Sequence, residues 1–223
     1  MSECLSYVAS VPIHKFGITG PILLGIHNVS VSDIDLTIYG YNNALLVKQA
    51  LRREYKSSGG PLRQLNKSQE GDWCTKKASQ FSIDYETAAS ILARKWNFGF
   101  YAEKFFSIHP IKLDSEISEN YGEKEFKSEG VVLIEARVDN AIEAIFNPAF
   151  YKVGEFITLR GPQVNDIKEV VSFESVFSDI GFPNQFIRVR GNLEMVTNRI
   201  TKEKHHRVVV GSRNVRSAEY IIP

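Results

Sequence analysis

The last third of the chain carries short runs of β-branched and aromatic residues, and a turn signal follows each run. The runs span residues 156–159, 170–173, 186–189 and 207–210. The turn signals are Gly161-Pro162, Gly181-Phe182-Pro183, Gly191-Asn192 and Gly211-Ser212. Several short strands at such spacing are typical of small all-β modules. The pattern therefore predicts a barrel or sandwich in this part of the chain.

The first part of the chain mixes helical and extended patterns. Apolar residues at helical spacing predict helices over 44–55 and 84–97, and a proline at a helix start predicts a short helix over 21–26. Period-two and apolar runs predict strands over 14–18, 33–39, 105–111 and 131–138. Residues 56–80 are polar and rich in Ser and Gly, so we expect a long connection that is mobile in part. We predict an α/β (α+β) domain over 1–145 and a β-rich accessory domain over 146–223.

Composition narrows the class of protein. The 223 residues include 27 Lys and Arg and 26 Asp and Glu, so the net charge is close to zero. The protein as a whole therefore does not attract a polyanion, and any contact with nucleic acid has to come from a local basic patch. No apolar run is long enough to span a bilayer, and the N-terminus is not patterned as a signal peptide. Cys4 and Cys74 have no partner at zinc or CxxC spacing. We therefore expect a cytoplasmic protein with free thiols and no membrane partner.

Two carboxylates carry the chemistry that the sequence suggests. Asp33 and Asp35 stand at i and i+2 of a predicted strand, so both project from one face while Ile34 and Leu36 project from the other. Like charges side by side repel, and a hard divalent cation such as Mg²⁺ relieves that repulsion. A turn at Gly20 before a short helix offers backbone N–H groups to phosphate. Together these features predict a site for a nucleotide and a metal ion.

The same segment resembles a known superfamily. A turn of hydrophobic-Gly-[Gly/Ser] followed, after a short spacer, by Asp-hydrophobic-[Asp/Glu]-hydrophobic is typical of nucleotidyltransferases of the DNA polymerase beta type. Here Thr19-Gly20-Pro21 is followed by eleven residues and then Asp33-Ile34-Asp35-Leu36. The segments Leu23-Leu24-Gly25 and 32–40 resemble the corresponding segments of an archaeal branch of predicted nucleotidyltransferases. Because members of that branch are often longer at the N-terminus, we expect an upstream segment to be missing.

The resemblance implies a mechanism and a set of roles. It implies that Asp33 and Asp35 hold two Mg²⁺ ions and that Thr19, Gly20, Pro21 and Ser32 contact the nucleotide. It implies transfer of a nucleoside monophosphate from an NTP to an acceptor hydroxyl, with release of pyrophosphate. It also implies a third carboxylate from a neighbouring strand. The acceptor, the base and the oligomeric state carry no sequence signal.

Two features depart from the superfamily pattern. Pro21 has neither hydroxyl nor N–H to give to a phosphate, and the loss of one such contact costs about 1–3 kcal/mol. No unmistakable third acidic strand follows. Glu135, Arg137 and Asp139 share a strand face. Glu135, in the middle of the strand, is our first choice for the third carboxylate, and Asp139, at the strand end, is the second. The alternative is that Glu135 belongs to a solvated edge with a Glu–Arg pair.

Other polar groups leave two interpretations open. His109 either touches a substrate or is an ordinary satisfied histidine. The C-terminal basic run either binds RNA or another nucleic acid, or forms a charged rim; it comprises Arg199, Lys202, Lys204, His205, His206, Arg207, Arg213 and Arg216. His205 and His206 face opposite sides of a strand, so they are not expected to share a metal. The alternative to an active enzyme is a catalytically inactive nucleotide- or RNA-binding module, which Pro21 and the missing third acidic strand favour.

Overall fold

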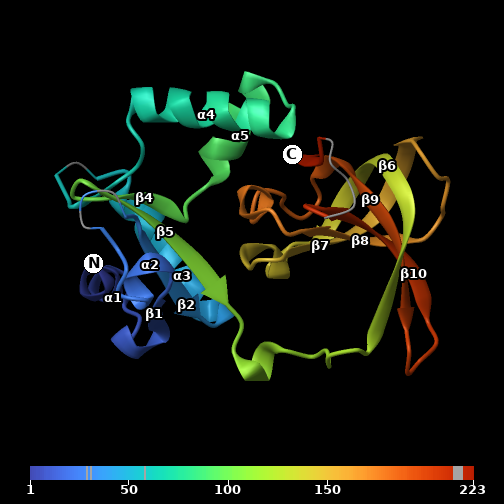
Figure 1. Ribbon diagram of the computed structural model, residues 1–223, viewed down its shortest axis with the longest axis horizontal. Coiled ribbons are helices and arrows are strands. Elements are labelled where there is room, and N and C mark those ends of the chain that lie inside the picture. Colours follow the sequence, from blue (N-terminus) through green and yellow to red (C-terminus); the bar gives the residue numbers. More distant parts are fainter. Residues whose placement is uncertain (29, 31, 58, 213–217) are drawn as a thin grey trace. The chain divides into compact units, whose positions relative to one another are not determined.

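Figure 1 shows the computed structural model, which describes residues 1–223 except residues 29, 31, 58 and 213–217. The chain forms two compact units. The first comprises Met1–Glu70 and Lys95–Ile117, and the second comprises Gly71–Arg94 and Ser118–Pro223. The described residues form two mixed sheets and five α-helices, so the predicted α+β class with a β-rich second module is confirmed. The domain boundary near residue 145 stays a prediction.

The first unit is built on a five-stranded mixed sheet of order β1-β2-β5-β4-β3. Its strands are β1 (Phe16–Ile18), β2 (Ile34–Tyr39), β5 (Lys104–Ile111), β4 (Phe98–Tyr101) and β3 (Leu62–Arg63). β2 and β5 run parallel, whereas the other neighbouring strands are antiparallel. The strands predicted over 33–39 and 105–111 are therefore both present and lie side by side.

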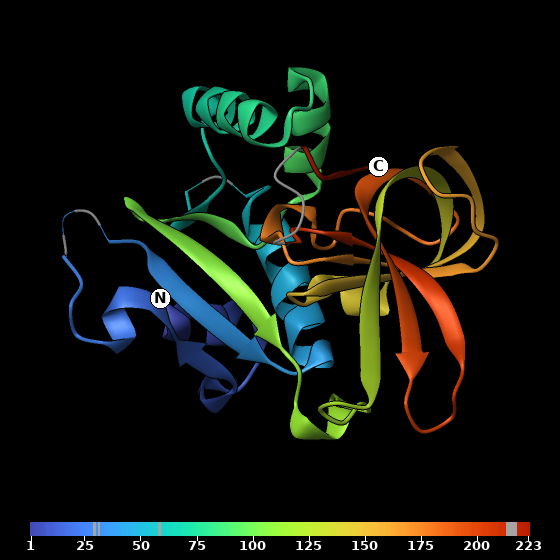
Figure 2. The ribbon, with the colours of Figure 1, turned by 45° about the vertical axis from the view of Figure 1, so that its right-hand side comes forward.

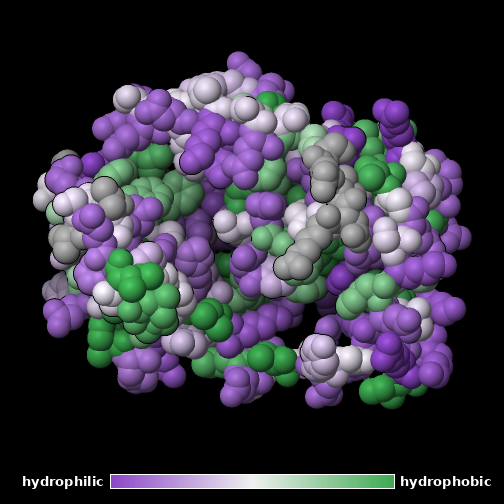
Figure 3. All heavy atoms as spheres, in the orientation of Figure 1, coloured by the Kyte–Doolittle hydropathy of each residue, from purple (hydrophilic) through white to green (hydrophobic). Residues whose placement is uncertain are grey.

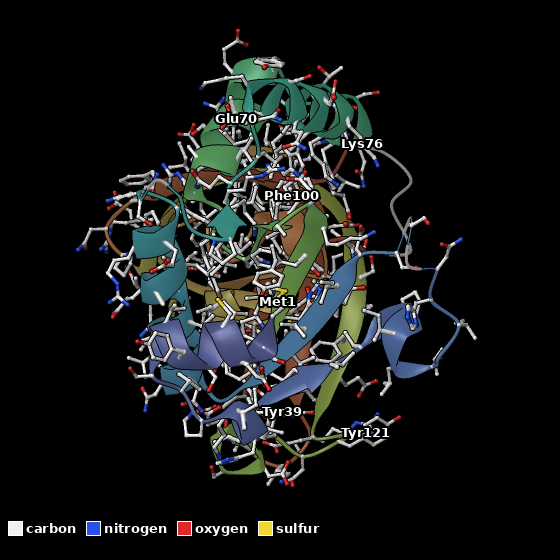
Figure 4. The ribbon with its side chains drawn as sticks, turned by 90° about the vertical axis from the view of Figure 1, so that its left-hand side faces the viewer. Met1, Tyr39, Glu70, Lys76, Phe100 and Tyr121 are labelled. Atoms are coloured by element: carbon white, nitrogen blue, oxygen red, sulfur yellow. The ribbon has the colours of Figure 1, made fainter. Side chains whose placement is uncertain are left out.

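The two faces of this sheet differ in character. Leu36, Ile38, Phe106 and Ile108 are fully or almost fully buried. Helix α3 (Tyr41–Glu54) lies against β2 and β5, and helix α1 (Ser2–Ala9) lies against α3. Figure 4 shows both helices beside the sheet, with Tyr39 labelled at the end of β2. Because side chains alternate along a strand, the opposite face is left to polar residues of β2 and β5.

Local signals explain where the predicted helices begin. The short helix α2 (Gly20–Leu23) has proline at its start, as expected. α3 starts directly after Gly40, whose φ of 93° ends the strand. α5 (Tyr85–Arg94) starts after Asp84, whose Oδ1 accepts a hydrogen bond from the backbone N–H of Thr87 at 2.6 Å. The helices predicted over 21–26, 44–55 and 84–97 are thus present with slightly different ends.

The expectation of a long connection over 56–80 was wrong for residues 67–80. Residues Lys67–Phe81 form helix α4. A reciprocal capping box starts it: the N–H of Gln69 donates to Asn66 Oδ1 at 3.0 Å, and the N–H of Asn66 donates to Gln69 Oε1 at 2.9 Å. The helix is mostly polar, and only Cys74 and Phe81 are buried. Its apolar residues therefore show a weak helical period, which does not predict a helix.

The β-rich unit is a closed barrel with one added strand. Its strands are β6 (Lys124–Asn140), β7 (Ala149–Arg160), β8 (Ile167–Ser172), β9 (Phe186–Asn198), β10 (Lys204–Val210) and β11 (Tyr220–Ile222). The order is β10-β8-β7-β6-β9-β11, and β10 also pairs with β9. Five strands therefore close on themselves in the order β6-β7-β8-β10-β9, with β8 and β10 parallel. Figure 2 shows β6, β9 and β10 curving together.

The barrel encloses an apolar core. Ile134, Tyr151, Val170, Val189 and Leu193 are fully buried within it. The end of α4 and the middle of α5 join the same core through Phe81 and Ile91, and the Phe81 ring meets Phe177 edge-on at 4.8 Å. Four short 3₁₀ segments, Ile13–Lys15, Asp114–Glu116, Ile142–Ile145 and Ser175–Phe177, complete the described structure.

Strand β6 is longer than the strand predicted over 131–138. It starts at Lys124 and changes register against β9 between Ser128 and Gly130. Gly130 has a φ of 108°, which favours glycine and gives the bulge that bends the strand. The bent strand β6 can therefore pair with β7 along one edge and with β9 along the other.

Glycine at position 191 is required by steric closeness inside the barrel. A Cβ added there would overlap the backbone carbonyl oxygen of Val209, which the β9–β10 ladder holds in place. We predict that Gly191→Ala lowers the free energy of unfolding by about 1–3 kcal/mol, the range for overpacking. In contrast, Gly71→Ala, on helix α4 with nothing nearer than the Tyr85 hydroxyl at 3.8 Å, raises it by up to about 1 kcal/mol. Urea denaturation measures both; equal effects would contradict the prediction.

Candidate functional site

Asp33 and Asp35 lie at the start of β2. The strand begins at Ile34, so Asp33 immediately precedes it and is exposed, while Asp35 is its second residue and is half-buried. Partial burial, followed by the negative charge of Asp35, raises the pKa of the Asp33 carboxyl above its ordinary value. The two carboxylates thus act on one another electrostatically, which is the repulsion that a cation relieves.

The glycine turn and Asp35 lie in direct contact. The backbone N–H of Thr19 donates to the carbonyl oxygen of Asp35 at 2.9 Å, which extends the pairing of β1 with β2. Gly20 follows with a φ of +67°, and a Cβ on it would stand 2.6 Å from Asp35 Oδ2. Only glycine combines this backbone conformation with such a close approach to the carboxylate.

The other residues expected at the nucleotide have local roles. Pro21 lies in α2, and its carbonyl oxygen accepts a hydrogen bond from the N–H of Ile26 at 3.1 Å. The hydroxyl oxygen of Ser32 accepts a hydrogen bond from the N–H of Asn28 at 2.9 Å. Ser32 is therefore tied to Asn28, just ahead of Asp33. Leu23, Leu24 and Ile26 are 65–73% exposed, and Figure 3 shows green apolar surface over the N-terminal elements.

Two residues of β5 complete the polar face, and sequence reasoning missed one of them. In the parallel register Asp35 stands opposite Ser107, and Thr37 stands opposite His109. The Ser107 hydroxyl donates to Asp35 Oδ1 at 2.6 Å and lies 2.7 Å from His109 Nε2. His109 was a candidate for substrate contact, whereas Ser107 carried no signal until the strand pairing was known. Thr37 Oγ1 is buried on the same face, without a hydrogen-bond partner among the described residues.

The protons of this chain of hydrogen bonds can be placed. A carboxylate without a proton can only accept hydrogen bonds, so the Ser107 hydroxyl is the donor in its hydrogen bond with Asp35. The Ser107 oxygen then accepts from His109, whose Nε2 must carry a hydrogen. Burial is the main cause that lowers the pKa of His109, with the nearby Lys95 charge acting in the same direction and Asp35 opposing both. His109 is therefore a neutral imidazole at pH 7 that donates from Nε2.

The two candidates for a third carboxylate lie on β6 in the second unit. Glu135 Oε1 accepts hydrogen bonds from Arg188 Nε at 2.9 Å and from its NH2 group at 2.6 Å. Asp139 pairs with Arg137 at 3.1 Å. Glu135 also borders a surface pocket of about 290 Å³ with Phe186, Arg188 and Ile222. The Glu–Arg pair expected as the alternative is thus present, with Arg188 as the partner, and the catalytic role of Glu135 stays a prediction.

The donor set at β2 suits a hard cation bound together with a substrate. Asp33 and Asp35 offer carboxylate oxygens, the ligands that Mg²⁺ prefers when phosphates supply the rest. Within the described ranges, no group of three or more His, Cys, Asp or Glu side chains is arranged to hold a metal ion by itself. Two carboxylates could hold such a cation only if a substrate supplied further ligands, because the described residues form no metal cage of their own.

The C-terminal basic run is largely matched by carboxylates. Arg207 pairs with Glu194 at 2.8 Å, Arg199 with Glu125 at 3.6 Å, and His205 with Glu169 at 3.9 Å. His206 lies between Asp166 and Glu129. As expected, the two adjacent histidines face different partners. Arg213 and Arg216 lie outside the described residues. The arrangement matches the charged-rim interpretation more closely than a free basic face.

Comparison with known proteins finds a relative of archaeal origin. The chain is 32% identical over 214 residues to "Uncharacterized protein MJ1086" of Methanocaldococcus jannaschii. The match covers 95% of this chain, which spans 59% of the length of that relative. No protein-family model matches the chain, and no solved structure matches it. None of the helices in the described residues has both the length and the apolarity needed to cross a membrane.

The contact between Gly20 and Asp35 can be separated from backbone strain. Gly20→Ala and Gly25→Ala both place a side chain at a φ near +66°, which costs roughly 1–2 kcal/mol in each. Nothing lies within 4 Å of a Cβ at Gly25, whereas at Gly20 it would press on Asp35. We expect Gly20→Ala to be the less stable variant in chemical denaturation. Equal losses would show that the close approach to Asp35 has no energetic weight.

The burial of His205 predicts a pH dependence of stability. Burial lowers the pKa of His205 below its ordinary value of 6.5, with Glu169 opposing that shift, and its Nε2 is buried without a hydrogen-bond partner among the described residues. As pH falls through 6.5, the unfolded chain takes up a proton that the folded chain resists, so the free energy of unfolding decreases.

Replacement of His205 by glutamine is expected to flatten this decrease between pH 7 and pH 5. The matched control is His14→Gln, at an exposed position. Urea unfolding at a series of pH values gives the slopes. An unchanged slope in His205→Gln would contradict the assignment.

Proposed function

We propose that this chain is a Mg²⁺-dependent nucleotidyltransferase-like protein that transfers a nucleoside monophosphate from an NTP to an acceptor hydroxyl. The observation that carries the proposal is the contact between the Gly20 turn and the Asp35 carboxylate, with Asp33 beside it. This contact joins the two halves of the sequence motif, which eleven residues separate along the chain. A polyphosphate at the turn would lie next to both carboxylates.

Each residue has a definite task in this proposal. Asp33 and Asp35 would hold the cation, which supplies positive charge to the phosphates and to the leaving pyrophosphate. Gly20 keeps side-chain atoms away from the turn, so that a phosphate can approach the backbone. Thr19 ties the turn to β2 through its hydrogen bond with Asp35. Pro21 has no N–H, so fewer hydrogen-bond donors are available to bind the phosphate than in the superfamily pattern.

A nucleotide-binding module without turnover is the second candidate. It is favoured by Pro21 and by the residue opposite Asp35 on β5, which is a serine rather than a carboxylate. In this version the same carboxylates and turn bind the nucleotide and its cation, and no pyrophosphate is released. The two candidates share the site and differ only in the chemical step.

The barrel offers a second candidate binding surface, for a nucleic acid. A closed five-stranded barrel with Greek-key connections is also the architecture of the OB-fold, many members of which bind oligonucleotides. The Arg207 guanidinium lies 3.7 Å from the centre of the Phe126 ring. Proteins that bind single-stranded nucleic acids also combine arginine with aromatic rings. Arg207 is already paired with Glu194, so the barrel architecture is what supports a nucleic-acid partner. RNA is therefore proposed as a partner of the barrel, and the acceptor hydroxyl is left unassigned.

Ligand-dependent stability tests the proposed function directly. Each NTP with MgCl₂ is added to the protein, and the melting temperature and the release of pyrophosphate are followed. A bound nucleotide at one hundred times its Kd stabilises by about 2.7 kcal/mol, which is about 5–10 °C for a chain of this size. Asp33→Asn combined with Asp35→Asn should abolish the shift, whereas Glu103→Gln, at an exposed acid of the same unit, should keep it.

The outcomes separate the candidates. A shift with pyrophosphate release in the presence of an acceptor pool supports the enzyme. A shift without release in every pool tested supports the binding module. No shift with any NTP, or an equal shift in the double Asp variant, would overturn both.

A further inference from the structure

The residue opposite Asp35 on the neighbouring parallel strand decides how many cations this site can hold. The resembled superfamily takes a third carboxylate from a neighbouring strand. Here β5 presents Phe105, Ser107, His109 and Ile111 on the face that it shares with Asp35, and none of these is acidic. The site therefore carries two negative charges on its strands instead of three.

Ser107 and His109 occupy this position with a defined hydrogen-bond chain. His109 Nε2 donates to Ser107, and Ser107 donates to Asp35 Oδ1 at 2.6 Å. This bond uses one oxygen of the carboxylate and fixes the plane of the group. The other oxygen, Oδ2, is the one that faces the Gly20 turn. Asp35 is thus oriented toward the turn by a hydroxyl and an imidazole, neither of which is acidic.

The available protein ligands then limit the cations. One divalent ion can take its ligands from Asp33, Asp35 and the phosphates, whereas a second ion would have to share those same oxygens because β5 adds no carboxylate. Across the described residues no third His, Cys, Asp or Glu joins this pair in a metal-holding arrangement. A site with two carboxylates and substrate phosphates suits one Mg²⁺.

We propose that the site binds one divalent cation, with Ser107 and His109 as positioning residues that orient Asp35 where the superfamily has a third carboxylate. The inference rests on the proposed function, because it concerns the same carboxylates. It departs from the two ions that the resemblance implies. Ser107 and His109 are assigned no contact with the substrate, since they act through Asp35.

Mn²⁺ is the probe for this proposal, since its EPR spectrum reports binding without turnover. The full chain is titrated with Mn²⁺ in the presence of an ATP analogue whose α,β-bridge resists cleavage. We expect one Mn²⁺ per chain. Ser107→Ala should still bind one ion, with an affinity about 10–100-fold lower, the range for lost groups that orient a metal ligand. Ser107→Thr, which keeps the hydroxyl, should restore the affinity.

Ser107→Asp provides the sharper variant, because it rebuilds the missing carboxylate opposite Asp35. We expect it to bind two Mn²⁺ ions with the analogue, while Ser68→Asp, an added acid at an exposed position of the same unit, should bind one. Circular dichroism checks that each variant is folded. If Ser107→Asp does not fold, the wild-type stoichiometry and the Ser107→Ala affinity still decide the proposal.

The possible results distinguish this inference from the proposed function. Two Mn²⁺ ions in the wild-type chain would overturn the inference and leave the function standing. An unchanged affinity in Ser107→Ala would overturn the positioning role, and one ion in folded Ser107→Asp would overturn the link between Ser107 and stoichiometry. No binding of Mn²⁺ and analogue together would overturn both proposals.

Discussion

The close approach of the Asp35 carboxylate to Gly20 is the constraint on which the candidate site depends. A carboxylate half-buried at the start of a strand is stable only when its oxygens are engaged. Ser107 engages Oδ1, while Oδ2 faces a glycine turn that leaves no room for a side chain. The pairing of β1, β2 and β5 produces both contacts, so the sheet and the site are specified by the same hydrogen-bonded ladder.

Much of the secondary structure could be predicted from local signals. Alternation in Asp33-Ile34-Asp35-Leu36 predicted β2, and apolar spacing predicted α3 and α5. The β-rich module was predicted from spaced turn signals, although one of them, Gly191-Asn192, lies inside β9 and forms no turn. Helix α4 was missed because its apolar period is weak, although Asn66 and Gln69 at capping-box spacing were available as a signal. The extent of β6 was missed because its first residues are polar and exposed.

The candidate site could be predicted only in part, for a physical reason. Gly20, Asp33 and Asp35 belong to one sequence motif, so a local pattern identifies them. Ser107 becomes relevant only because β5 pairs with β2 in a parallel register, and such non-local pairing leaves no trace in a single sequence. Glu135 was chosen by strand alternation alone, and that pattern could not reveal its hydrogen bonds with Arg188.

The central claim is that Asp33 and Asp35 grip a cation jointly with a polyphosphate at the glycine turn. Anomalous scattering from crystals grown with MnCl₂ and a non-cleavable ATP analogue would test it most directly. The account predicts one Mn²⁺ peak, coordinated by oxygens of both aspartates and of the analogue. Manganese bound elsewhere, with both carboxylates uncoordinated and the analogue away from Gly20, would contradict it.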